Sequence, residues 1–199
     1  MFAERGVENV ALRDITAATD TNIAAINYHF GSKRGLIEVL VERGAGEYAR
    51  RRARFLDALE ASGAENVDLR HVVEALVVPT AEMVSNAADG RYYAQFLSRL
   101  ATHPGFLPLV NKAYDPHTNR YLALLARATP HLDDDVRLLR FVAAKELVNQ
   151  FVGESSGRLP AWLDTHTSVD FDQTVSALVD MLVGLFSAAT TSGAKSAKL

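Results

Sequence analysis

The stretch that decides the fold runs from Thr16 to Lys33 and reads TAATDTNIAAINYHFGSK. The spacing of its apolar residues predicts one short helix over residues 11–19 and a second over residues 21–30, joined by a turn at Asp20. Two short helices joined by a tight turn are typical of a helix-turn-helix, which places its second helix in the DNA major groove. The pattern therefore predicts a DNA-binding segment near the N-terminus.

A long helix is predicted directly after this segment, over residues 33–60, with Ser32 as its N-cap. Gly44 and Gly46 lie inside it, and we expect them to be the points at which it could bend. We place the boundary between a DNA-binding domain, residues 1–45, and a second domain, residues 46–190, within this helix. Residues 191–199 are small and basic, which predicts a disordered tail.

The residues of this region closely resemble the DNA-binding domain of the TetR family of bacterial transcriptional regulators. The matching residues are Phe2-Ala3-Glu4-Arg5-Gly6, Leu12-Arg13-Asp14-Ile15, Ile26-Asn27-Tyr28-His29-Phe30-Gly31-Ser32-Lys33 and Leu36-Ile37. The resemblance implies an all-α protein with an N-terminal helix-turn-helix domain and a C-terminal ligand-binding and dimerisation domain. It implies a homodimeric regulator, most simply a repressor, that binds a palindromic operator in double-stranded DNA and is released by a small apolar effector.

The chain departs from the family pattern in two places. Residues 2–6 look like only the last turn of a first helix, where family members usually carry a longer one. Either the true start lies upstream, or the domain lacks one of its packing helices. Asp20 stands where the family usually has glycine, and aspartate tolerates the left-handed backbone that this turn needs.

Nine residues are the candidate DNA contacts. A helix that turns Ile26 and Phe30 inward presents the small and polar residues of 22–29 outward, where Asn can read adenine and Ala can touch a thymine methyl. Lys33 begins the next helix, where an ammonium and free N–H groups can hold a phosphate. Ile23 is compatible with either the core or the groove. The candidates are Arg13, Thr16, Asn22, Ala24, Ala25, Asn27, Tyr28, His29 and Lys33.

Composition excludes several other classes of function. The chain has 199 residues, 48% of them hydrophobic, and no cysteine, which rules out disulfides, thiolate metal sites and cysteine nucleophiles. No run of about 18 apolar residues is present, so no membrane contact and a cytoplasmic location are expected. Residues 1–54 hold nine Lys/Arg against seven Asp/Glu, whereas the whole chain has net charge −3. That asymmetry fits an N-terminal part that meets phosphate.

The second half of the chain reads as further helices, near residues 69–86, 91–102, 107–129, 133–153 and 170–190, with a loop over 153–169. The runs 136–152 and 171–186 are apolar on more than one face, so they must be covered on two sides. In the family two such helices from each chain form a four-helix dimer interface. A single deep monomer core is the alternative.

Aromatic and basic residues between the two parts are the candidate effector pocket, by the same resemblance. They are Tyr92, Phe96, Arg99, Phe106, Tyr114, His117 and Tyr121. The segment HPGFLPLVNK, residues 103–112, further resembles a subgroup that senses fatty acids or acyl thioesters. We expect no cofactor, no metal and no catalytic residue. Two alternatives remain: a dimeric small-molecule-binding protein that has lost DNA binding through N-terminal truncation, and a small enzyme that uses the C-terminal cavity.

Overall fold

The computed structural model describes residues 1–63, 67–85, 89–114, 116–154 and 170–190, and within these ranges the all-α prediction is confirmed, with no strand. The predicted tail over residues 191–199, and all but the first two residues of the predicted 153–169 loop, lie outside the described residues. The helices are α1 (Phe2–Arg5), α2 (Leu12–Thr19), α3 (Ile23–Phe30), α4 (Lys33–Ala61), α5 (Leu69–Ser85), α6 (Gly90–Ala101), α7 (Leu107–Tyr114), α8 (Thr118–Ala128), α9 (Asp134–Val148), the π-helical η1 (Asn149–Glu154) and α10 (Phe171–Ser187).

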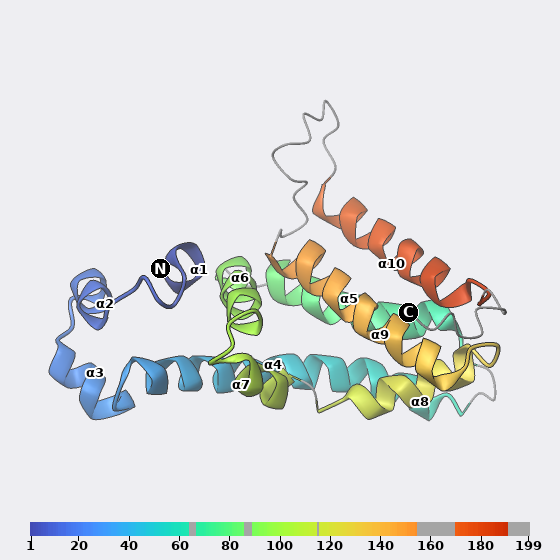
Figure 1. Ribbon diagram of the computed structural model, residues 1–199, viewed down its shortest axis with the longest axis horizontal. Coiled ribbons are helices and arrows are strands. Elements are labelled where there is room, and N and C mark those ends of the chain that lie inside the picture. The colour runs from blue at the N-terminus through green and yellow to red at the C-terminus, as the bar shows by residue number, and fades with distance from the viewer. Residues whose placement is uncertain (64–66, 86–88, 115, 155–169, 191–199) are drawn as a thin grey trace, which may run out of the picture.

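The molecule is long, with the helix-turn-helix at one end (Figure 1). Helix α4 runs from that end along most of the molecule, and α5, α8, α9 and α10 gather around its far half. Helices α6 and α7 lie between the two parts, with α6 beside α1. We call α1–α3 with the start of α4 the head, and α5 with α8–α10 the body.

One predicted helix is wrong. Residues 107–129 form two helices, α7 and α8, rather than one. The break falls around Pro116, which has no N–H to donate and disfavours helical geometry in the residue before it. Helix α8 restarts after His117, whose backbone carbonyl accepts from the Tyr121 amide at 3.1 Å.

The head has no separate core, because its apolar residues pack directly onto α6 and α7. Ala3, Val7, Ile37 and Val41 share one buried cluster with residues of those helices. The partners from α6, α7 and the turn between them are Phe96, Leu97, Leu100, Phe106 and Val110. The boundary that we predict near residue 45 falls inside the continuous α4, and it stays a prediction.

The body has its own core, built where α4, α5, α8, α9 and α10 meet. Tyr121 lies fully inside it and donates its hydroxyl to the Ala75 carbonyl at 2.6 Å. Burial raises the pKa of this hydroxyl well above its usual range, so Tyr121 stays neutral. Each buried polar group of this core must find a partner inside the fold, and Tyr121 finds it on the neighbouring helix.

Helices α9 and α10 keep apolar side chains in solvent. Leu139 is 69% exposed and Met181 is 55% exposed, and Leu138 and Val142 on α9 are also about half exposed. The same two helices bury Phe141, Leu182 and Phe186 on their other sides. This is the two-sided apolar pattern predicted from the sequence, with one side packed on the body and one side uncovered in the single chain.

Candidate functional site

The turn of the helix-turn-helix depends on Asp20. Its backbone has φ 50° and ψ 39°, the left-handed region. Its N–H donates to the Thr16 carbonyl and so caps the C-terminus of α2, which ends at Thr19. No other described non-glycine residue has positive φ. The expectation that aspartate can replace glycine here is confirmed, because its short polar side chain lowers the cost of this conformation.

Helix α3 begins at a side-chain cap. The Oδ1 of Asn22 accepts from the Ala25 amide at 2.7 Å, so Asn22 fixes the first turn of the helix. Ile26 is buried and anchors the helix to the head, and Gly31 ends it with φ 71°. The cap leaves the Asn22 NH2 group available, so this residue can still donate to a phosphate at the helix start.

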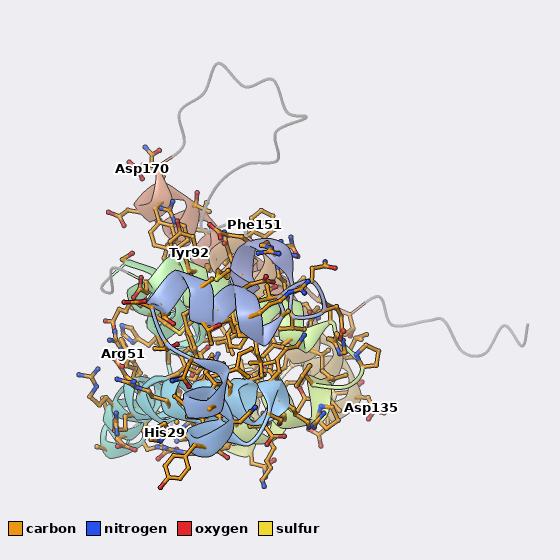
Figure 2. All side chains as sticks on the ribbon, turned by 90° about the vertical axis from the view of Figure 1, so that its left-hand side faces the viewer. His29, Arg51, Tyr92, Asp135, Phe151 and Asp170 are labelled. Carbon is orange, nitrogen blue, oxygen red and sulfur yellow. The ribbon has the colours of Figure 1, made fainter. Side chains whose placement is uncertain are left out.

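The outer face of α3 is open to solvent. Tyr28 is 86% exposed, with its ring edge-on to that of His29 at 5.1 Å between centroids. Figure 2 looks onto this end of the molecule and shows His29 on the α3 side, away from the labelled Phe151 of the body. Of the other candidates, Arg13, Asn22, Ala24 and Asn27 are exposed and Ala25 is half-buried. Ile23 is also exposed, which favours a groove contact over the core.

Two of the nine candidates are placed differently from our expectation. Thr16 is buried, and its hydroxyl donates to the Arg13 carbonyl one turn back in the same helix. Lys33 turns its ammonium inward, where Nζ donates to the Val7 carbonyl at 2.6 Å and to the Val10 carbonyl at 3.0 Å. We correct both assignments: a phosphate contact would require Lys33 to give up the two carbonyls that it holds.

Substitution Lys33→Met is therefore expected to destabilise the head. It removes two charge-assisted hydrogen bonds to carbonyls, which costs about 1–3 kcal/mol of unfolding free energy. DNA affinity should fall with stability, but the slope of log affinity against log salt should stay unchanged, because the substitution removes no phosphate contact. Thermal unfolding and fluorescence anisotropy over a salt series measure both quantities.

The matched control is Arg13→Met on the exposed side of α2. If Arg13 binds a phosphate, its removal should make the salt slope shallower by about one unit per arginine, with little change in stability. A Lys33→Met protein of normal stability with the shallower slope would show that the ammonium clamps phosphate after all.

A cavity of about 190 Å³ lies between α4, α5, α6, α7 and the α9–η1 segment. The wall includes the apolar side chains of Met83, Ala94, Leu97 and Val110. It also includes the charged side chains of Arg52, Lys145 and Glu146 and amide side chains of η1. The remaining lining residues are Tyr48, Thr80, Ser98, Ala101, Thr102, Leu107, Asn111, Asn149, Gln150 and Gly153.

The six predicted effector residues whose side chains are described do not line this cavity. Phe96 and Phe106 are buried in the cluster that joins the head to α6 and α7, and Tyr121 is buried in the body core. Tyr92 and Arg99 are exposed to solvent. Nε2 of His117 forms a hydrogen bond with the Ala49 carbonyl at 3.1 Å. The side chain of Tyr114 lies outside the described part of the chain. The six described side chains of the predicted pocket therefore do not come together around this cavity, and the position of an effector site stays a prediction.

Helices α6 and α7 touch the head and also form the cavity wall. On the head side, Tyr93 donates its hydroxyl to the Leu40 carbonyl of α4 at 3.1 Å, and the rings of Phe2 and Phe96 stack at 5.9 Å. His103 Nε2 lies 2.6 Å from a carboxylate oxygen of Glu8 in the head. Helix α6 therefore contacts both the cavity and the head.

Gly44 allows the close approach of α6 to α4. A Cβ at this position would lie 1.9 Å from the Tyr93 hydroxyl oxygen, whereas a Cβ at Gly46 would meet no atom within 4 Å. Helix α4 is continuous through both residues. Gly44 is thus the residue over which Tyr93 reaches the α4 backbone. Beside it, a groove of about 480 Å³ carries charged residues that include Arg43, Glu47 and Asp89.

The described residues contain neither a cluster of metal-binding side chains nor a helix suited to span a membrane. They contain no group of three or more side chains suited to hold a metal ion. Within the same ranges, no helix has the combination of length and apolarity needed to cross a bilayer. The geometry instead defines a helix-turn-helix head, with the exposed helix α3, joined to a helical body, and a small, partly open cavity lies between α4, α5, α6, α7 and the α9–η1 segment.

Comparison with known proteins agrees with this class. Residues 1–40 match the model of bacterial regulatory proteins of the tetR family, and residues 74–184 match that of tetracyclin repressor-like C-terminal domains. The chain therefore belongs to the TetR family. It is similar to YttP of Bacillus subtilis (strain 168), described as a probable HTH-type transcriptional regulator, with 28% identity over 102 residues. The match covers 51% of this chain and 45% of that relative, less than half of its length.

Proposed function

We propose that this protein is a homodimeric repressor that binds a palindromic operator through α3 and leaves it when a small effector fills the body cavity. The observation that carries the proposal is the outer face of α3, where Asn27, Tyr28 and His29 stand in solvent on a helix anchored by Ile26. These side chains can donate to base edges and phosphates, and Ala24 leaves room for the backbone to approach the groove.

The dimer is supported by the uncovered faces of α9 and α10. Leu138, Leu139, Val142 and Met181 would be buried if the two helices of one subunit packed on those of another. Two heads related by a twofold axis then read two inverted half-sites. For helix-turn-helix dimers these half-sites lie about 34–36 Å apart, or a multiple of that distance.

Effector control is supported by the shared use of α6 and α7. An effector that enters the cavity presses on Leu97 and Ala101 of α6, and that helix holds the head through Tyr93 and Phe96. A shift of α6 changes the spacing of the two heads, so effector and DNA weaken each other's binding by the same factor. The fatty acid or acyl thioester that the sequence resemblance favours would need more room than about 190 Å³ gives.

Substitution Gly44→Ala tests this transmission. The added Cβ displaces Tyr93 from the Leu40 carbonyl, so we expect a loss of about 1–3 kcal/mol of unfolding free energy from overpacking. We also expect the effector to lower DNA affinity less than in the parent protein, because α6 no longer holds α4 in one position. Thermal unfolding and DNA titrations with and without effector measure the two effects.

Gly46→Ala is the matched control. It adds the same methyl group two residues away in open space and should raise stability by up to about 1 kcal/mol through helix propensity alone. If both variants keep the parent's effector response, α6 does not act on the head through Tyr93.

The DNA-binding part of the proposal is tested without knowledge of the operator. Non-specific binding rests on phosphate contacts, so duplex DNA of arbitrary sequence should bind at low salt and dissociate steeply as salt rises. Fluorescence anisotropy of a labelled duplex measures this. A folded protein with no affinity at low salt would favour the alternative of a dimeric small-molecule-binding protein that has lost DNA binding.

A further inference from the structure

Among the described residues, two arginines are buried, and they differ in their hydrogen bonding. Arg137 on α9 has a full set of partners: its guanidinium donates to the Thr129 hydroxyl and carbonyl and to the Leu132 carbonyl, and it pairs with Asp134. Arg52 on α4 is equally buried, with 6% of its surface exposed, yet its Nε has no hydrogen-bond partner. A buried cation without a partner is costly, so a counter-ion is expected.

The surroundings of Arg52 supply aromatic faces and no anion. The guanidinium carbon lies 4.4 Å from the centre of the Tyr48 ring and 5.5 Å from that of Tyr121. No carboxylate of the described residues lies within ion-pair distance of it. The Tyr121 hydroxyl, neutral because burial raises its pKa, donates to a backbone carbonyl, and the Tyr48 hydroxyl is paired with that of Thr80 at 2.8 Å.

Arg52 forms part of the wall of the 190 Å³ cavity, together with apolar residues of α6 and α7. The described charged residues of the wall are Arg52, Lys145 and Glu146, and of these Arg52 has a buried Nε without a hydrogen-bond partner. We propose that the effector is a compact organic monoanion, a carboxylate with a short apolar body, whose carboxylate binds the Arg52 guanidinium. That the bound anion acts as an effector depends on the proposed function. The anion-binding site itself is inferred from Arg52 and its cavity alone.

The volume of the cavity and the charge of Arg52 both limit the class of ligand that can bind. A cavity of about 150 Å³ holds benzene, so this one takes a molecule of about that size with a carboxylate attached. The planar fork of arginine matches a carboxylate with two parallel hydrogen bonds, and the apolar wall of Leu97 and Val110 takes the body of the ligand. A second charge on the ligand would lack the guanidinium partner that Arg52 gives the first, and a long acyl chain exceeds a volume of about 190 Å³.

The test is calorimetric titration of the full chain with three probes. Benzoate has the expected size and charge, benzamide has the same shape without the charge, and palmitate represents the long acyl class. We expect benzoate to bind and to raise the Tm, and benzamide to bind at least tenfold more weakly. Equal binding of benzamide, stronger binding of palmitate, or no binding of benzoate at millimolar concentration would each overturn the proposal.

Variants of Arg52 separate binding from a structural role. Arg52→Met should weaken benzoate binding by 30-fold or more. Arg52→Lys keeps the charge but loses the planar fork, so its benzoate affinity should lie between those of the parent and of Arg52→Met. In the free protein Arg52→Met should raise the Tm, because an unpaired buried charge is replaced by an apolar side chain of similar length. A lowered Tm with unchanged benzoate binding would show a purely structural arginine.

Arg54→Met on the exposed side of the same helix is the control, and it should change neither the benzoate affinity nor the Tm. DNA binding is measured separately in each variant. If benzoate binds through Arg52 but the protein has no affinity for DNA, the repressor proposal fails and the anion site stands. If DNA binds and benzoate does not, only the effector assignment fails.

Discussion

Changing Asn27 and Tyr28 together to alanine is expected to lower operator affinity about 100-fold or more, with no change in thermal stability. Tyr28 is 86% exposed and Asn27 is exposed beside it, so neither shares the burial of Ile26, which anchors α3 to the head. A side chain that reads a base edge contributes about 1–3 kcal/mol, and in a dimer each substitution acts at both half-sites. Operator titration by anisotropy and thermal unfolding of the same samples measure both effects.

Tyr92→Ala on α6 is the control, because it removes a tyrosine that is 50% exposed and lies outside α2 and α3. It should leave operator affinity unchanged. A double variant at Asn27 and Tyr28 that binds the operator as tightly as the parent would exclude α3 as the recognition helix and would contradict the proposed mode of binding.

The second large effect is expected at the uncovered face of α9. Leu139→Glu puts a charge at the centre of the proposed four-helix interface, where burying it without a partner costs several kcal/mol. The protein should change from dimer to monomer, and affinity for a two-half-site operator should fall by 100-fold or more, because binding of the second head is no longer intramolecular. Light scattering after size-exclusion chromatography measures the mass.

Val39→Glu is the matched control for the mass measurement. It places the same charge on an exposed apolar side chain of α4, away from α9 and α10, and should leave the dimer intact. The monomeric variant should still fold, because Leu139 is largely exposed within its own chain, but its Tm should lie below that of the parent dimer, which dimerisation stabilises. A Leu139→Glu protein that remains a dimer would place the interface elsewhere.

The helix-turn-helix could be predicted from the sequence because its determinants are local. The left-handed turn at Asp20, the cap at Asn22 and the inward positions of Ile26 and Phe30 all act within one or two helical turns. The division of residues 107–129 into two helices was also visible in principle, since Pro116 marks the break. Those features need no knowledge of tertiary packing.

The placements that differ from expectation depend on interactions between distant segments. Lys33 meets carbonyls 23 and 26 residues earlier in the chain, and no local pattern predicts that its ammonium turns inward. Phe96 and Phe106 are aromatic residues between two domains, which suits a pocket and a packing interface equally well. Only the position of α6 against α1 and α4 decides between the two.

Arg52 is absent from the predicted site residues, although the sequence contains a signal for it. It belongs to the run Arg50-Arg51-Arg52, which reads as a solvated charged face. The buried residues of α4 are Ile37, Val41, Ala45, Tyr48, Arg52 and Leu56, a stripe with spacings of three and four. A charged residue on the apolar stripe of a helix predicts a buried cation that needs a partner, which is a protein group at Arg137 and, in our proposal, a bound anion at Arg52.

The most direct test of the central claim is selection of bound duplexes from a pool of random-sequence DNA by the purified chain. The account predicts enrichment of an inverted repeat whose half-sites lie about 10 base pairs apart, centre to centre, or a multiple of that. The variant with alanine at Asn27 and Tyr28 should lose this enrichment. A folded protein that enriches no sequence over the input pool, or an α3 variant that enriches the same repeat, would contradict the account.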